Sequence, residues 1–175
     1  VALTTAQAAV LTSAQVSVMS TAQLSKLETA DFAALGTSAI AALSVDQAIK
    51  LTTDQLVALT TDQTAKLSTD ALSALNSAQV GVLQTSDLAQ VSTAAIAAMT
   101  TTAIAGLTEL QVSKLTTAQV AGLTIDQVAK LSTTQVAALT TAQAAALTSD
   151  QIQALSTAQI QAIETPDFAA LSTSA

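Results

Sequence analysis

The chain has 175 residues, half of them hydrophobic, and its 12 acidic and five basic residues give a net charge of −7. It contains no His and no Cys, which excludes disulfides, metal sites built on these side chains, and His or Cys catalysis. A nucleic-acid partner is not expected, because the basic residues are five scattered lysines.

Leu recurs every eight residues from Leu3 to Leu171 without an insertion or deletion. The 21 complete octads, counted from Leu3 as position one, run over residues 3–170, and their consensus is L-[T/S]-T-[A/D]-Q-[V/I]-A-[A/K]. Leu occupies position one in 18 of 22 cases. Residues 1–175 are therefore predicted to form one continuous repeat domain.

Each octad predicts the start of one short helix. Position two is Ser or Thr in 17 of 22 cases, and position five is Gln in 14 of the 21 complete octads. This S/T-x-x-Q spacing is a capping box, and the apolar residues at positions one and six are placed as the partners of a hydrophobic staple. Pro166 at position four leaves open whether the cap of the last octad slips from Glu164 to Thr165.

The charged residues support this assignment. All 12 acidic residues lie at positions two to five, near the predicted helix starts, and all five lysines lie at position eight, near the predicted ends. This is the arrangement that helix dipoles favour, by about 0.3–1 kcal/mol each. One long helix is excluded, since a period of eight rotates the apolar stripe by ~80° per repeat. A β-solenoid is disfavoured by the poor strand formers Ala, Gln and Lys.

A six-residue helix is not stable alone, so the octads must stack on one another. We predict an all-α fold, an α-solenoid with about three or four short helices per turn. In this coil Leu and Val point inward, Ala permits close stacking, and Thr and Gln line the corners and the exterior. The four glycines, Gly36, Gly81, Gly106 and Gly122, are predicted to relieve tight joints.

A longer period lies above the octad. Residues 1–39 match residues 137–175 at 26 of 39 positions, and the only two phenylalanines, Phe32 and Phe168, share the context E-T-x-D-F-A-A-L. Both are expected to fill the core. The offset of 136 residues predicts a super-repeat, so that the chain would be an excerpt of a larger array.

Two patterns could carry chemistry. The acids Asp46, Asp54, Asp62 and Asp70 occupy position four of successive octads and could bind calcium if successive corners lie close. The alternative is charge placed at helix starts. The Thr and Ser array at positions two and three could bind ice, or its hydroxyls could be consumed by capping. No catalytic residue, no enzyme activity and no cofactor is predicted.

The octads resemble the Leu-Thr-Thr-x-Gln-Val-Ala-Ala arrays of large bacterial secreted or surface proteins, often labelled adhesin-like. The resemblance covers essentially the whole chain and implies a structural role as an extracellular stalk, spacer or self-assembling fibre. The alternative it leaves open is an adhesin-type module that binds a glycan, ice or a calcium-dependent ligand. We expect end-to-end or lateral self-association at the bacterial surface, without membrane insertion, because no apolar run approaches a membrane span.

Overall fold

The computed structural model describes residues 3–171 and confirms an all-α coil, with no strand in that range. Each octad forms one helix of four to six residues. The helices are α1 Thr5–Ala9, α2 Ser13–Ser17, α3 Thr21–Leu24, α4 Thr29–Ala33, α5 Thr37–Ala41, α6 Val45–Ala48, α7 Thr53–Ala58, α8 Thr61–Thr64, α9 Thr69–Ser73, α10 Ser77–Gly81, α11 Thr85–Leu88, α12 Thr93–Ala98, α13 Thr101–Ala105, α14 Glu109–Lys114, α15 Thr117–Ala121, α16 Ile125–Lys130, α17 Thr133–Ala137, α18 Thr141–Ala145, α19 Ser149–Gln153, α20 Thr157–Ala162 and α21 Thr165–Ala170.

The predicted capping box starts the helices. In α15, Thr116 is the N-cap in extended conformation (φ −71°, ψ 156°), and its hydroxyl accepts the backbone N–H of Gln119, whose side chain in turn accepts that of Thr116. Every octad with Gln at position five has this reciprocal pair. In α21 the cap does not slip, because Glu164 is the N-cap and Pro166 lies in the first turn.

The chain changes direction between consecutive helices without a loop. Among the described residues none has a positive φ, so the helices do not end on the left-handed residue that is common elsewhere. Each helix instead runs into the extended backbone of the next N-cap, and this extended residue sets the angle between consecutive helices. The joints therefore need no glycine.

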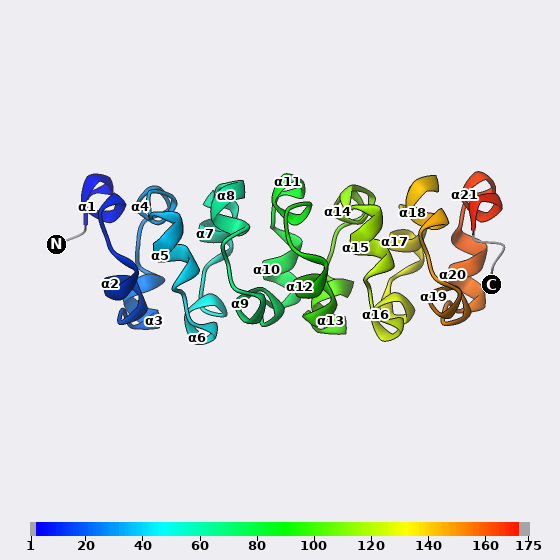
Figure 1. Ribbon diagram of the computed structural model, residues 1–175, viewed down its shortest axis with the longest axis horizontal. Coiled ribbons are helices and arrows are strands. Elements are labelled where there is room, and N and C mark those ends of the chain that lie inside the picture. The colour runs from blue at the N-terminus through cyan, green and yellow to red at the C-terminus, as the bar shows by residue number, and fades with distance from the viewer. Residues whose placement is uncertain (1–2, 172–175) are drawn as a thin grey trace.

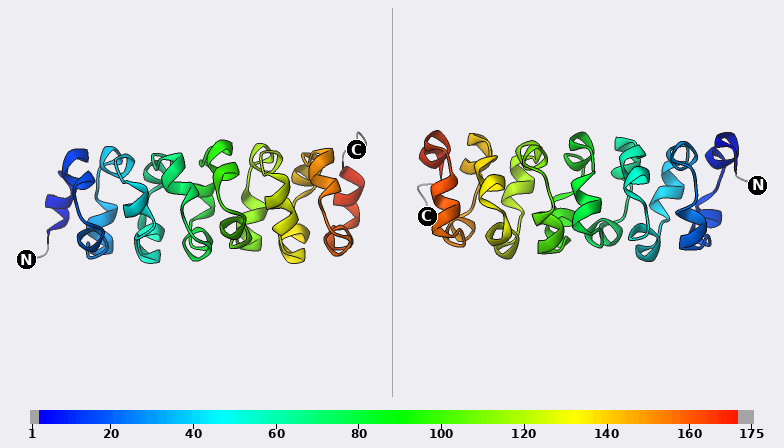
Figure 2. Two further views of the ribbon diagram at one scale, coloured as in Figure 1. Left: turned by 90° about the horizontal axis from the view of Figure 1, so that it is seen from below. Right: turned by 180° about the vertical axis from the view of Figure 1, so that it is seen from behind.

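The helices wind into a straight rod, with α1 at one end and α21 at the other (Figure 1; two further views in Figure 2). Each helix packs on the helix three octads further along, as α1 does on α4 and α18 on α21. Most of the large apolar residues at positions one and six are buried along the axis in one continuous cluster. The predicted α-solenoid is confirmed.

The two phenylalanines differ in burial. Phe32 in α4 is fully buried beneath α7, as predicted for a core residue. Phe168 in α21 is 53% exposed, so the prediction that it fills the core is wrong. No helix three octads beyond α21 lies within residues 3–171, so no described turn covers this side chain as α7 covers Phe32.

Glycine matters where two turns approach closely. A Cβ added to Gly106, after α13, would lie 2.5 Å from Cβ and 2.6 Å from Cα of Ser77 in α10. At Gly36, the N-cap of α5, an added Cβ would meet nothing within 4 Å. Gly106 is therefore needed for the close approach of two turns. The sequence had instead predicted that the glycines relieve crowding in the joints between consecutive helices.

We expect Gly106→Ala to lower the free energy of unfolding by about 1–3 kcal/mol, because the added methyl group would force α10 and α13 apart. Urea denaturation monitored by circular dichroism measures this loss. Gly36→Ser is the matched control, expected to be neutral or stabilising, since it adds a preferred N-cap in open space. Equal stability of Gly106→Ala and the unmodified chain would contradict the close packing.

Candidate functional site

The most elaborate polar feature of the rod is a row of buried glutamines between turns. Gln119 is 2% exposed, and its Oε1 accepts the N–H of Thr116 at 2.8 Å. Its Nε2 donates to the carbonyl oxygens of Leu88 and Val91 in the preceding turn, both at 2.7 Å. One carboxamide thus begins its own helix and binds the turn before it.

The same arrangement is repeated along the rod, and we call it the glutamine ladder. Each member is buried, and its Nε2 donates to carbonyl oxygens 28 to 31 residues earlier, at 2.6–3.5 Å. The members are Gln47, Gln55, Gln63, Gln79, Gln111, Gln119, Gln127, Gln135, Gln143, Gln151 and Gln159. Gln was predicted on the exterior, and this was wrong for all eleven.

The ladder satisfies carbonyls that helices this short cannot satisfy themselves. Leu88 is the last residue of α11, and Val91 immediately precedes the N-cap Ser92 of α12. The last four carbonyls of a helix have no partner within it, and leaving one unpaired inside the protein costs about 1–3 kcal/mol. No buried side-chain nitrogen or oxygen in residues 3–171 is left without a partner.

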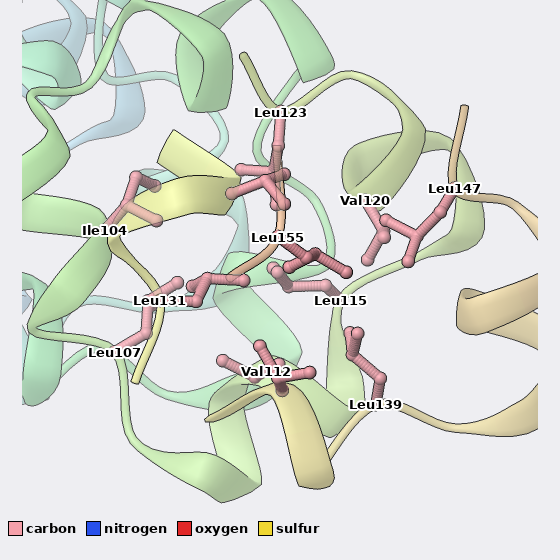
Figure 3. Close-up of a pocket in the computed structure, with 12 residues that line it drawn as sticks. Ile104, Leu107, Val112, Leu115, Val120, Leu123, Leu131, Leu139, Leu147 and Leu155 are labelled. Carbon is pink, nitrogen blue, oxygen red and sulfur yellow. The ribbon is translucent and has the colours of Figure 1, made fainter. Parts of the chain in front are cut away.

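Inside the ladder lies an axis of aliphatic side chains. Figure 3 shows Leu107, Val112, Leu115, Leu131 and Leu139 pointing toward one another. Val112 lies in α14, and the four leucines lie in the joints between helices. The space they leave is a cavity of about 10 Å³ lined only by Leu, Val and Ile. A cavity this small barely accommodates one water, so the axis between Ile104 and Leu155 is a packed core with no room for an organic ligand.

Three octads replace the ladder with a buried aspartate at position five. Asp31, Asp87 and Asp167 are 4%, 1% and 7% exposed. Each accepts the hydroxyl of the Thr at position three of the helix three octads earlier, at 2.6–2.8 Å. The hydrogen bond between turns is kept, but here the earlier turn is the donor.

The octads with Asp at position five also differ from the consensus at position two. Position two, usually Ser or Thr, is Glu28, Gln84 or Glu164 where position five is Asp. Gln84 Nε2 donates to the carbonyl of Val57 at 2.9 Å. This N-cap residue at position two thus makes the bond to an earlier turn that a ladder glutamine makes from position five. Asp87 also accepts the fully buried hydroxyl of Thr64 at 3.4 Å.

The structure does not bring the four candidate calcium ligands together. Asp46, Asp54, Asp62 and Asp70 lie in the first turns of α6, α7, α8 and α9, and each is exposed. Successive helices point in different directions around the rod. Within residues 3–171 no group of three or more acidic side chains is close enough to hold a metal ion.

The other polar groups are mostly structural. Hydroxyls at position two accept helix N–H groups, as at Thr100 and Ser132. Lys114 and Lys130 lie in the last turns of α14 and α16 and are exposed. Of the surface clefts, one of about 420 Å³ lies between α14 and α17, where Glu109, Leu110 and Gln135 line it.

None of the helices between residues 3 and 171 has both the length and the apolar character needed to cross a bilayer.

The coil of identical turns defines a structural repeat protein. A family model described as the ALTTAQ repeat matches residues 24–61, 50–85, 80–117 and 126–157, together more than half of the chain. The chain belongs to this family. No curated protein and no solved structure matches it significantly.

Replacing a ladder amide by a carboxylate tests the hydrogen bonds between turns. Gln119→Glu keeps the oxygen that caps α15 but loses both donors and buries a charge against two carbonyls. We expect a loss of about 3 kcal/mol or more in the free energy of unfolding at pH 7, measured by urea denaturation. Gln15→Glu, at an exposed glutamine with the same capping box, is the control, with an expected change within about 0.5 kcal/mol.

The buried aspartates are predicted to be structural. Asp87→Ala removes the acceptor of the Thr61 and Thr64 hydroxyls, so we expect it to cost about 1–3 kcal/mol in thermal or urea unfolding. Asp62→Ala, at an exposed acid in a helix first turn, should cost under about 1 kcal/mol. Equal effects of the two substitutions would show that the bond between Asp87 and the earlier turn contributes nothing.

Proposed function

We propose that the chain is a mechanical element, an extracellular rod that serves as a stalk or spacer of a bacterial surface or secreted protein. The observation that carries the proposal is the glutamine ladder. It joins successive turns by the same side-chain-to-backbone bonds on both sides of a gap between Gln79 and Gln111, where Gln84 and Asp87 make the bonds between turns. A rod built in this way holds its shape by many equivalent interfaces.

The axis and the surface support the same role. Between Ile104 and Leu155 the axial cavity is too small for a ligand, and the large buried apolar side chains are aliphatic except for Phe32 and Met99. The absence of Cys suits export, because no thiol is available for oxidation. A surface location remains part of the proposal, as does the absence of catalysis.

The spacer role predicts that length follows repeat number. Duplicating residues 115–138, which are three complete octads, should lengthen the rod by a constant step at each duplication and leave its diameter unchanged. Small-angle X-ray scattering gives both dimensions. A duplicated chain that becomes thicker, or a radius of gyration that belongs to a compact particle, would contradict the proposal.

The second candidate is a binding module, and the surface clefts between turns favour it. The cleft at Glu109, Leu110 and Gln135 is open and contains polar groups that could accept a sugar. Thermal unfolding with and without a glycan panel, and with calcium, separates the two candidates. A stabilisation abolished by Leu110→Ala, with Ile125→Ala as the exposed control outside this cleft, would favour binding.

A further inference from the structure

One complete turn in the interior of the rod lacks the glutamine ladder. The octads of α11, α12 and α13 have Asp87, Ala95 and Ala103 at position five, and they are the only three consecutive octads without Gln there. Because each helix packs on the helix three octads away, these three helices form one turn, which packs on α8, α9 and α10. We call the contact between these two turns the middle interface.

The side-chain hydrogen bonds of the middle interface lie at one edge, where α11 follows α8 along the upper side of the rod in Figure 1. Asp87 accepts the hydroxyls of Thr61 and Thr64, at 2.6 and 3.4 Å. Gln84, the N-cap of α11, donates to the carbonyl of Val57 at 2.9 Å. Within residues 3–171 no side-chain hydrogen bond joins α12 to α9 or α13 to α10.

The other two edges are packed by small residues. Ala95 and Ala103 stand in the place of ladder glutamines and are 1% and 0% exposed. A Cβ added to Gly81 would lie 2.9 Å from the carbonyl oxygen of Gly106, so the ends of α10 and α13 are in close contact. These two edges are therefore held by apolar and backbone packing alone.

The following interface has hydrogen bonds at all three edges. Gln111, Gln119 and Gln127 each donate to a carbonyl oxygen 28 residues earlier, at 2.7–2.8 Å. By the same register, the acceptors opposite the two alanines of the middle interface are the carbonyls of Leu67 and Leu75. No side chain of residues 3–171 donates to either of them. The middle interface thus keeps the acceptors of the ladder and lacks its donors.

The two kinds of contact respond differently when the rod is bent. A hydrogen bond weakens steeply as its angle departs from linear, so an interface with such bonds at three edges resists tilting. Apolar contact is non-directional and resists only the loss of buried area. An interface that is hydrogen-bonded at one edge and packed at the other two can therefore tilt about the bonded edge.

We propose that the middle interface is a hinge of the rod. The edge formed by α8 and α11 is the pivot, and α12 and α13 tilt against α9 and α10 when the rod is bent or pulled. The proposal rests on the spacer function, since it names the point at which the spacer yields first. A rotation at this one interface leaves the turns on both sides intact.

Paired spin labels measure this tilt directly. The chain has no Cys, so two introduced cysteines can be labelled specifically, and double electron–electron resonance gives the distribution of distances between the labels. Asp54→Cys with Thr102→Cys, the hinge pair, spans the contact of α13 on α10. Thr102→Cys with Asp150→Cys, the control pair, spans two interfaces with ladder glutamines. All three residues are exposed at position four, and each pair is six octads apart.

We expect the distance distribution of the hinge pair to be roughly twofold broader than that of the control pair. Asp62→Cys with Leu110→Cys, the pivot pair, spans the α8–α11 edge over the same six octads and should be as narrow as the control.

Restoring the amides is expected to remove the difference. Ala95→Gln with Ala103→Gln should narrow the hinge pair to the width of the control pair, with circular dichroism to establish that helix content is kept. The hinge, control and pivot pairs decide the proposal even where this variant does not fold.

Equal widths of the hinge and control pairs would overturn the proposal. A pivot pair as broad as the hinge pair would also overturn it, because the whole turn would then be loose. Asp54→Cys with Asp150→Cys tests the spacer function separately, since in a straight rod its mean distance is close to the sum of the two shorter ones. That sum with equal widths rejects the hinge and keeps the spacer, whereas a distance far below the sum rejects the rod.

Discussion

The fold depends on the side-chain amide of the glutamine at position five, because its oxygen and its nitrogen both form hydrogen bonds with the backbone. A helix of five residues leaves nearly all of its backbone N–H and C=O groups without partners of its own. Gln119 solves both halves of this problem, because its oxygen accepts an N–H at the start of α15 and its nitrogen donates to two carbonyls in the preceding turn. Repeated along the rod, this bond lets helices far too short to exist alone form a continuous coil.

The substitutions tolerated in the repeat follow from the same requirement. Where Gln is replaced by Asp, as at Asp87, a threonine hydroxyl from the earlier turn becomes the donor, and Gln84 supplies the missing amide from position two. The chain can thus change which residue makes the bond, but each buried polar side chain in residues 3–171 retains a partner. Most positions along the axis are filled by Leu, Val or Ile, and Met99 is buried in the place of Leu at position one.

Much of this architecture could be predicted from the sequence. The period of eight, the S/T-x-x-Q spacing and the sorting of Lys and acidic residues fix where each helix begins and which positions face the axis. The inward role of the glutamines was missed, although a signal existed. A capping box accepts Glu as readily as Gln, and the helix dipole favours Glu, yet no octad has Glu at position five. Only the need for an N–H donor explains that choice. The exposure of Phe168 could not be predicted from its sequence context, because Phe32 has the same context and is buried.

The absence of loops has a consequence for how such a chain can change over time. With each helix running directly into the next N-cap, an inserted or deleted single residue would change the separation of 28 to 31 residues for every amide–carbonyl pair that spans it, and would put the Leu residues on its two sides out of register along the axis. Only gain or loss of complete octads preserves both registers at once. Genes for such coils can therefore expand or contract by slippage between identical units and still encode a folded protein, so that length becomes the trait most open to selection.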